Sequence, residues 1–178
     1  MPLEPAMPFT IFESPFGPLT LVAGEDGLRH LYFPGRGPAR HEDDRDPTQL
    51  TTAVGQLEQY FEGERTTFDL PLDCHGTPFQ RHVWVALQNI PYGETTTYGA
   101  LAEKLSAQPR AVGAAVGATP IPIIIPCHRV IGSDGSLTGY GGGLQRKRAL
   151  LDFEASGGDR SAFLTAWRQR QLALAWSE

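Results

Sequence analysis

The sequence of 178 residues has little cysteine and no long apolar segment. Its two cysteines, Cys74 and Cys127, are too few for a disulfide framework, and no spacing typical of a four-ligand zinc site is present. No apolar run approaches the roughly 18 residues that a membrane-spanning helix needs. Residues 1–8 carry neither a basic cluster nor an apolar core, so we expect no signal peptide. These absences predict a cytoplasmic protein that uses no metal, cofactor or membrane.

Acidic residues outnumber basic ones, but the imbalance is confined to the first part of the chain. The net charge of the whole sequence is −5. Residues 1–75 hold 5 Lys and Arg against 13 Asp and Glu, which gives −8, whereas residues 76–160 hold 8 against 6, which gives +2. Charge alone therefore argues against a nucleic-acid partner, although the second part could face a polyanion weakly.

The first part of the chain predicts a small sheet and one helix. The stretches rich in β-forming residues are 9–12, 19–23 and 28–33. Asp26-Gly27 predicts a hairpin turn between the last two. After a polar loop, Asp46 and the proline that follows predict the start of a helix, whose apolar residues recur at spacings of four and three as far as Phe61. We expect residues 1–75 to form an N-terminal α/β domain with an antiparallel sheet.

The pattern becomes helical after residue 75. The predicted helices begin at Thr77-Pro78 and then cover residues 98–105, 109–118, 144–155 and 163–176. The short break at residues 106–108 is typical of a helix-turn-helix unit. The apolar run of residues 120–126 contains three prolines and is predicted to be extended. The fold class is therefore α+β, with a mostly helical C-terminal domain over residues 76–178.

Cys127 is the first candidate for chemistry, because a potential base follows it directly. The thiolate is the reactive form of cysteine, and His128 could take the thiol proton while Arg129 adds positive charge. Adjacent residues point to opposite faces of a regular strand, so the pair can cooperate only where the strand has ended, which Pro126 permits. An equally good interpretation is that Cys127 is a small buried side chain at the end of a core strand.

Glu154 is a candidate for orienting His128, because it lies on the helix predicted after the glycine-rich loop. From sequence alone, a solvated glutamate on a helix surface is the more usual outcome. Cys74-His75 is a second Cys-His pair, but no apolar strand leads to it. We therefore interpret that pair as structural or incidental.

The helix predicted over residues 109–118 (PRAVGAAVGA) consists mostly of glycine and alanine. Such residues let a helix backbone come close to another surface, although the glycines weaken an isolated helix. That surface could simply be a neighbouring helix. The alternative is nucleic acid, toward which Arg110 would reach from the positive N-terminal end of the helix.

Three motifs together resemble one known protein family. They are RAVG at 110–113, PCHRV at 126–130 and GYGGGL at 139–144. In their order and spacing they are similar to the O6-alkylguanine-DNA alkyltransferase family, and the similarity runs over about residues 77–156. Residues 1–75 fit the variable N-terminal domain of that family only in outline. The resemblance implies DNA repair by direct reversal, in which an alkyl group moves irreversibly and stoichiometrically from O6 of guanine to the protein.

The resemblance implies a role for four residues in the transfer itself. Cys127 would accept the alkyl group. His128 would remove the thiol proton through a water molecule, and Glu154 would hold His128. Tyr98 would hydrogen-bond the flipped guanine and help to protonate the leaving base. A thioether is not readily hydrolysed, so each molecule would react once.

The resemblance also implies contacts with double-stranded DNA that contains O6-alkylguanine. The target atom lies inside the base stack, so the base must leave the duplex at a cost of a few kcal/mol. Small residues would let the second helix of the helix-turn-helix unit enter the minor groove, where an inserted side chain fills the gap. The residues implied are Arg110 as the inserted side chain, Ala111, Gly113 and Ala114 on the helix, the carbonyls of Cys127 and Val130 at the guanine amino group, Tyr140 at the alkyl pocket, and Gly141.

Two positions depart from the family pattern. Thr119 stands where the family usually has asparagine, at the junction of the small-residue helix and the segment leading to Cys127. An amide can bridge two backbone segments, whereas a threonine hydroxyl is a single donor, so we expect an incomplete bridge and a less stabilised thiolate. Gly141 stands where some members carry a serine that donates to the guanine oxygen. The N-terminal zinc cysteines of some members are also missing, so we expect no metal.

Two other functions stay open at this stage. Relatives that have lost the cysteine only bind damaged DNA, although the intact PCHR motif argues against that function here. A hydrolase that uses Cys127, His128 and Glu154 would turn over repeatedly. A hydrolase would not explain the glycine-alanine helix or Arg110.

We expect the protein to act as a monomer.

Overall fold

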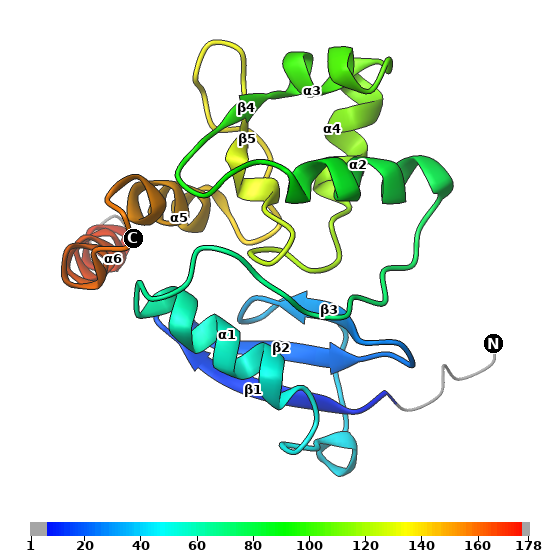
Figure 1. Cartoon of the computed structure of the whole chain (residues 1–178). Helices are drawn as coiled ribbons and strands as arrows, with labels where there is room; N and C mark the ends of the chain where they lie inside the picture. The colour runs from blue at the N-terminus through cyan, green and yellow to red at the C-terminus, as the bar shows by residue number, and fades with distance from the viewer. Residues whose placement is uncertain (1–6, 176–178) are drawn as a thin grey trace.

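The computed structural model describes residues 7–175 (Figure 1). The predictions about residues 1–6, and about Trp176 as the end of the last helix, lie outside the described residues. A three-stranded sheet with one helix forms the lower part of the molecule in Figure 1, and the other helices lie above it and to one side. Within the described part of the chain, no helix is both long and apolar enough to cross a membrane.

The sheet is antiparallel and its strands follow chain order, β1-β2-β3. Its strands are β1 (Phe9–Ser14), β2 (Gly17–Ala23) and β3 (Leu28–Tyr32). The three predicted strands are therefore confirmed to within two residues at each end. Leu19 and Leu21 are fully buried, so one face of β2 belongs to the core.

Neighbouring segments of the chain pair with the start of β1 and with the outer edge of β3. At β1, the backbone N–H of Asp46 donates to the carbonyl of Phe9 at 2.8 Å. At β3, residues 71–73 pair with the start of the strand, and the N–H of Leu31 donates to the carbonyl of Pro120 at 3.0 Å. This last bond ties the sheet to the segment that leads into the PCHR motif.

Helix α1 (Thr51–Phe61) packs on the sheet but begins later than predicted. The predicted start at Asp46 is wrong, because Oδ1 of Asp46 accepts hydrogen bonds from the N–H and the hydroxyl of Thr48 and closes a turn instead. Leu50, at the N-cap, has a φ of 59°, which separates this turn from the helix. The helix ends before Gly63, as predicted.

The remaining helices agree closely with the predicted ones. They are α2 (Pro78–Gln88), α3 (Tyr98–Lys104), α4 (Pro109–Gly117), α5 (Leu144–Ala155) and α6 (Arg160–Ala175). Thr77 caps α2 in a capping box, and Thr97 caps α3 by accepting a hydrogen bond from the N–H of Ala100. The short connection between α3 and α4 confirms the predicted helix-turn-helix shape. Only α6 differs, since it begins at Arg160 rather than at Phe163.

The apolar run of residues 120–126 is not extended, contrary to prediction. A turn at Ile123 and Ile124 reverses the chain, so that Pro122 and Ile125 form an isolated bridge. Ile123 has a φ of 73°, a left-handed conformation that costs a β-branched residue roughly 1–3 kcal/mol. Burial of the turn in the core offsets this cost. The turn was missed because it contains neither glycine nor asparagine.

A very short parallel pairing joins two parts of the helical region. It consists of β4 (Thr96–Thr97) and β5 (Val130–Ile131), with Thr96 opposite Val130. β4 leads directly into α3, and β5 follows the PCHR motif. The pairing therefore holds the start of the helix-turn-helix unit beside Cys127.

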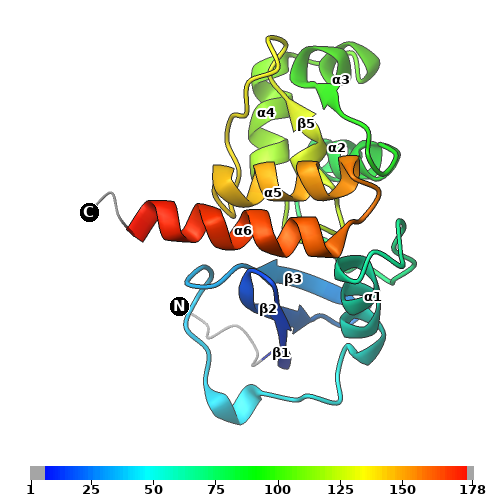
Figure 2. The ribbon, with the colours of Figure 1, turned by 90° about the vertical axis from the view of Figure 1, so that its left-hand side faces the viewer.

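Helix α6 joins the sheet to the helical region, and Figure 2 shows it between α5 and the sheet. The ring of Phe163 lies 4.9 Å from Phe153 of α5 and 6.2 Å from Phe61 of α1, measured between centroids. One turn further along α6, Trp167 packs 4.8 Å from Phe16. These aromatic contacts make one continuous core out of both parts of the chain.

Candidate active site

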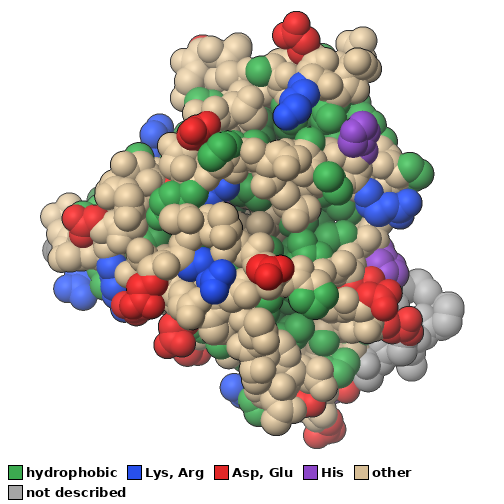
Figure 3. Space-filling model, in the orientation of Figure 1, with side chains coloured by type: hydrophobic (Ala, Val, Ile, Leu, Met, Phe, Trp, Pro, Cys, Tyr) green, Lys and Arg blue, Asp and Glu red, His purple; other side chains and the backbone are tan. Residues whose placement is uncertain are grey.

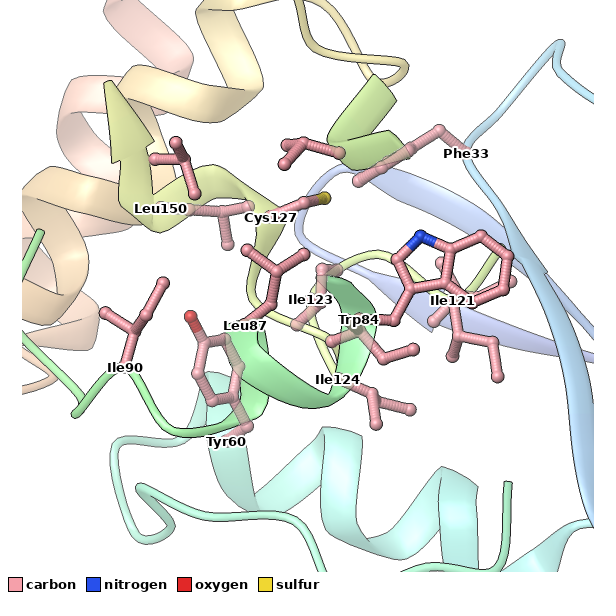
Figure 4. Close-up of a cluster of buried hydrophobic side chains, with 14 of the residues drawn as sticks. Phe33, Tyr60, Trp84, Leu87, Ile90, Ile121, Ile123, Ile124, Cys127 and Leu150 are labelled. Atoms are coloured by element: carbon pink, nitrogen blue, oxygen red, sulfur yellow. The ribbon is translucent and has the colours of Figure 1, made fainter. Parts of the chain in front are cut away.

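Cys127 begins a 3-10 helix (Cys127–Arg129) at the edge of a buried apolar cluster. Figure 4 shows the sulfur of Cys127 pointing away from Leu87 and Ile123, toward the side of the cluster where Phe33 lies. Only 5% of the residue is exposed. Because the chain has left strand geometry here, Cys127 and His128 are not forced onto opposite faces.

A small cavity of about 40 Å³ opens beside Cys127. Its walls come from the end of α4, the apolar turn and the glycine-rich loop, and consist of Val116, Gly117, Thr119, Pro122, Cys127, Gly139, Tyr140 and Gly141. The two residues expected at the pocket, Tyr140 and Gly141, therefore share it with the sulfur. A larger hollow of about 320 Å³ between β1, α1 and α6 contains none of the candidate residues.

Burial has the largest effect on the pKa of the Cys127 thiol. It raises the pKa of the thiol to about 11, although the polar Thr119 side chain nearby and the positive charge of Lys147 both lower it. At neutral pH the resting group is therefore a thiol. A reaction at this sulfur needs a base that takes the proton.

His128 is fully buried and directs one ring nitrogen at a carboxylate. Its Nε2 lies 2.7 Å from Oε1 of Glu154. Because a carboxylate can only accept, the ring proton belongs on Nε2, and Nδ1 keeps its lone pair. Among the described residues, none bonds to the buried Nδ1 atom. The imidazole thus has the tautomer that a general base requires.

Glu154 is only 3% exposed, so the surface location that its sequence context favours is wrong. Its Oε1 accepts hydrogen bonds from the Tyr60 hydroxyl at 2.7 Å, from His128, and from Nη2 of Arg129 at 2.9 Å. Its Oε2 accepts from Nε of Arg129 at 2.8 Å and from the N–H of Gly93 at 3.4 Å. Burial alone would raise the pKa of Glu154, but His128 and Arg129 outweigh burial and hold it well below its usual range.

Arg129 and Tyr60 belong to this network, although the sequence analysis does not identify them as site residues. Arg129 is buried, donates to the carbonyl of Ile90 at 2.6 Å, and lies 5.7 Å from the centroid of the Tyr92 ring. Its charge neutralises that of Glu154. An arginine within a buried apolar motif is a signal that could have identified it, because such a charge needs a partner. Tyr60 comes from α1, and no local pattern connects it with Glu154.

Tyr98 reaches the site from the first turn of α3. Its hydroxyl donates to the carbonyl of Thr138 at 3.2 Å. Lys147 from α5 donates to the same carbonyl at 2.9 Å, and its ammonium group lies 5.8 Å from the Tyr98 ring centroid. Lys147 is fully buried, and its pKa is lowered by that burial. The sequence analysis misses Lys147, because two further basic residues flank it and suggest a solvated helix face.

Helix α4 has a buried inner face and an outer face that consists, apart from one arginine, of very small side chains. The inner face is formed by Val112, Ala115 and Val116, and the outer face by Arg110, Ala111, Ala114, Gly117 and Ala118 with Gly113 at its margin. Trp84 of α2 donates from Nε1 to the carbonyl of Ala115 at 2.9 Å and fixes the helix from behind. The surface over α3 and α4 carries few charged side chains on the face shown in Figure 3.

The loop that carries Tyr140 and Gly141 is held from the side of the sheet. Phe33, directly after β3, lies 5.7 Å from the Tyr140 ring, measured between centroids. A Cβ atom on Gly142 would come within 2.6 Å of the Phe33 ring, so only glycine fits there. Arg146 donates to the carbonyl of Gly142 at 2.9 Å and lies over the same ring. One wall of the cavity therefore depends on the N-terminal part of the chain.

The second Cys-His pair lies in another environment. His75 is 2.9 Å from Oδ1 of Asp73, and Asp73 also binds Arg29 at 2.6 Å. Burial raises the pKa of Cys74, which is half-buried. These bonds fit the structural interpretation of Cys74 and His75.

Two family models match the chain, and together they span most of it. The DNA binding domain of 6-O-methylguanine DNA methyltransferase matches residues 78–156. The ribonuclease-like domain of the same protein matches residues 7–74. Both matches agree with the resemblance stated from the motifs.

Similar proteins come from bacteria and archaea. The methylated-DNA–protein-cysteine methyltransferase of Mycobacterium tuberculosis is 51% identical over 152 residues, which cover 83% of this chain and 92% of the relative. The enzyme of the same name from Methanosarcina acetivorans is 46% identical over 155 residues, with coverage of 84% and 99%.

Solved structures confirm the α+β fold. The structure of Mycobacterium tuberculosis OGT in complex with DNA has a TM-score of 0.80 at 49% identity, and the match covers 88% of this chain and 98% of that one. An O6-methylguanine DNA methyltransferase from Methanococcus jannaschii has a TM-score of 0.63 at 29% identity, with coverage of 82% and 92%.

Proposed function

Because the chain belongs to the 6-O-methylguanine DNA methyltransferase family, it repairs DNA by alkyl transfer, and we propose that Cys127 is the residue that accepts the alkyl group. The observation that carries this proposal is the position of Cys127 directly before a buried His128–Glu154 pair. A pair of this kind supplies the base that a thiol with a raised pKa requires.

The proton of Cys127 passes through a water molecule to Nδ1 of His128, the nitrogen that keeps its lone pair. The imidazole becomes a cation, and the carboxylate of Glu154 at Nε2 stabilises it. Arg129 keeps Glu154 ionised and fixed, so the histidine neither turns nor loses its tautomer. The buried charges are thus in place before the substrate arrives, which is how an active site avoids reorganisation during reaction.

The thiolate then attacks the alkyl carbon of O6-alkylguanine. The new bond joins Sγ of Cys127 to that carbon, the bond from the carbon to O6 breaks, and its electron pair stays with the guanine. Tyr98 hydrogen-bonds the base and helps to supply the proton that the leaving guanine takes up. The product is guanine in the DNA and a thioether on the protein, so the transfer is irreversible and stoichiometric.

The partner of this reaction is double-stranded DNA containing O6-alkylguanine. We place the outer face of α4 in the minor groove, where Ala111, Gly113 and Ala114 permit close approach and Arg110 fills the space of the flipped base. The carbonyls of Cys127 and Val130 read the guanine amino group, and Tyr140 and Gly141 border the alkyl group.

The setting of the reaction completes the proposal. We divide the chain into an N-terminal α/β domain over residues 1–75 and a DNA-binding, alkyl-accepting domain over residues 76–178. We expect it to act as a monomer in the cytoplasm, where the free thiols of Cys74 and Cys127 stay reduced.

A stoichiometry experiment tests this function. The protein is mixed with an excess of a duplex that carries O6-methylguanine with a labelled methyl group, and intact-mass analysis counts the methyl groups per molecule. We expect at most one, located on Cys127. Cys127→Ala should transfer none and still bind the duplex, whereas the matched variant Cys74→Ala should transfer as the natural chain does.

Other outcomes would support the alternatives. Many methyl groups released per protein molecule would indicate a hydrolase. Binding without any transfer by the natural chain would indicate a lesion-binding protein. Label on Cys74 would exclude Cys127 as the acceptor.

A further inference from the structure

The glycine-rich loop that forms one wall of the cavity beside Cys127 has little packing of its own. Residues 139–143 consist of Tyr140 and four glycines. A Cβ atom built on Gly139, Gly141 or Gly143 would meet nothing within 4 Å. Because glycine loses more conformational freedom on folding than any other residue, such a loop forms a defined wall only if other residues anchor it.

Two anchors hold the loop, one at each end. Before the loop, the carbonyl of Thr138 accepts hydrogen bonds from Tyr98 and Lys147. At the other end, Nη1 of Arg146 donates to the carbonyl of Gly142 at 2.9 Å. The first anchor belongs to the candidate site, whereas the second comes from a residue that the proposed reaction does not use.

Three aromatic rings surround the guanidinium of Arg146. Its Cζ atom lies 5.4 Å from the ring centroid of Phe33, 5.9 Å from that of Trp167 and 6.0 Å from that of Phe16. Its Nε is buried and bonds to none of the described residues, and no ion pair in the described part of the chain includes Arg146. The attraction between cation and rings therefore fixes this side chain, and we call the four residues the Arg146 clamp.

One ring of the Arg146 clamp also contacts the loop. A Cβ atom on Gly142 would lie 2.6 Å from the Phe33 ring and 2.9 Å from the Tyr140 ring. Figure 4 shows Phe33 on the side of the buried cluster to which the sulfur of Cys127 points. The Arg146 clamp thus holds the Gly142 backbone against Phe33, next to the part of the loop that lines the cavity.

We propose that Arg146 is a positioning residue, which keeps the cavity narrow through Gly142 and thereby makes the alkyl site selective for small alkyl groups. This inference rests on the proposed function, in which the alkyl group enters the cavity beside Cys127. The cavity volume of about 40 Å³ is close to the ~30 Å³ that one water molecule takes in the liquid. A methyl group fits such a space, whereas a benzyl group has to displace a wall.

The two kinds of alkyl group should therefore respond differently to a loosened loop. A close-fitting wall keeps the methyl carbon in line with the sulfur, and a small misplacement of reacting atoms slows a reaction strongly. A benzyl group makes its own contacts and gains room when the loop moves away. A general loss of stability, in contrast, would slow both transfers.

The test replaces Arg146 by methionine, which keeps an unbranched apolar side chain against the rings but removes the charge and the donors. Arg146→Lys keeps the charge and one donor, and Arg148→Met, at an exposed arginine of the same helix, is the matched control. Each full-length protein reacts with two duplexes that differ only in carrying O6-methylguanine or O6-benzylguanine. The ratio of the two second-order rate constants cancels any change in DNA binding.

A second measurement follows the loop without DNA. Iodoacetamide labels the thiols, and peptide mass analysis gives the rates of Cys127 and Cys74 separately. Cys127 is only 5% exposed, so its rate reports whether the cavity wall has opened. Thermal unfolding checks that every variant is folded.

We expect Arg146→Met to lower the ratio of methyl to benzyl transfer about tenfold. Labelling of Cys127 by iodoacetamide should become roughly threefold faster, because the loop opens locally, and labelling of Cys74 should not change. Arg146→Lys should keep the ratio within about threefold of the natural chain, and Arg148→Met should leave it unchanged. If Arg146→Met does not fold, Arg146→Gln, which is shorter and uncharged, should shift the ratio in the same direction.

An unchanged ratio in the folded Arg146→Met protein would overturn the proposal. Equal slowing on both duplexes would overturn it too, because it would indicate a general structural effect, and so would the same shift in Arg148→Met. The proposed function fails separately. If the natural chain takes no alkyl group from either duplex while Arg146→Met still accelerates the labelling of Cys127, the acceptor role and the selectivity are both overturned, and only the anchoring of the loop by Arg146 is supported.

Discussion

Among single residues, Gly141 leaves space at the cavity that a larger side chain could occupy. A Cβ atom built there meets nothing within 4 Å, and its φ lies outside the left-handed region. The family resemblance suggests a serine at this position as a donor to the guanine oxygen. The natural chain must use another donor, since glycine has no side chain.

We therefore expect Gly141→Ser to accelerate transfer from free O6-benzylguanine about two- to tenfold, the value of one net hydrogen bond of about 0.5–1.5 kcal/mol in the transition state. Second-order rate constants measured by intact mass check this. Gly141→Ala adds the same Cβ without the hydroxyl and should leave the rate unchanged. Similar acceleration by both variants would contradict the donor role and indicate a stiffening of the loop.

The candidate site was only partly predictable at the residue scale. Cys127 and His128 are adjacent in the chain, so their association could be proposed from sequence. Glu154 could be named as a candidate, but not its burial, because burial depends on Arg129 and Tyr60 arriving from other elements. Lys147 shows the same limit, since a fully buried lysine cannot be distinguished from its solvated neighbours by composition.

At the scale of elements, α4 has glycine and alanine side chains on its outer face and an arginine, Arg110, in its first turn. Because only duplex DNA requires base flipping, Arg110→Ala should slow repair of a methylated duplex at least tenfold, while reaction with free O6-benzylguanine changes less than twofold. The measurement is the ratio of the two second-order rate constants. Arg168→Ala, an exposed arginine of α6, is the matched control. An equal loss on both substrates would show that Arg110 is structural.

Elements were predictable where one local signal dominates. The capping residues Thr77 and Thr97 place α2 and α3 correctly, because a cap acts within a single turn. The side chain of Asp46 also accepts a local hydrogen bond, as an N-cap residue does. The donor is Thr48 in a turn, however, and no helix begins there. The turn at Ile123 is imposed by packing of the whole core and has no local signal.

At the scale of the whole molecule, the carboxylate of Glu154 in the candidate site is held by both parts of the chain. Tyr60 of α1 donates to Glu154 of α5, and burial keeps the pKa of Tyr60 well above its ordinary value, so the phenol stays a donor. Because the folded pKa of Glu154 lies below its unfolded value, the stability it contributes is present above about pH 4.5 and is lost as the pH falls toward the folded pKa.

Tyr60→Phe should lower the free energy of unfolding by about 1–3 kcal/mol, the effect of removing one hydrogen bond to a buried charge. Urea unfolding at pH 5 and pH 7 should give the same difference, since Glu154 is ionised in the folded state at both values. Tyr32→Phe, at a ring that stacks on His30, is the control and should have little effect. A difference that disappears at pH 5 would contradict a depressed pKa of Glu154.

The total charge gave the wrong indication about the partner. A net charge of −5 argues against nucleic acid, yet the family to which the chain belongs acts on DNA. The acidic excess lies in residues 1–75, whereas the match to the DNA binding domain covers residues 78–156. A recognition surface that relies on close approach of small residues needs less positive charge than one that binds phosphates alone.

The backbone pairing at the edges of the sheet affects how readily unreacted copies of such a protein associate with one another. A repair protein that is consumed in a single reaction has to be held in as many copies as there are lesions to remove. Unpaired strand edges on crowded copies are sites of intermolecular association. Here Asp46 pairs with Phe9 at the start of β1, while residues 71–73 and Pro120 pair with Leu28 and Leu31, so the outer edge of β3 offers little template for joining a neighbouring molecule. The bond from Leu31 to Pro120, which ties the sheet to the segment leading to Cys127, thereby also leaves less of this strand edge open to intermolecular association.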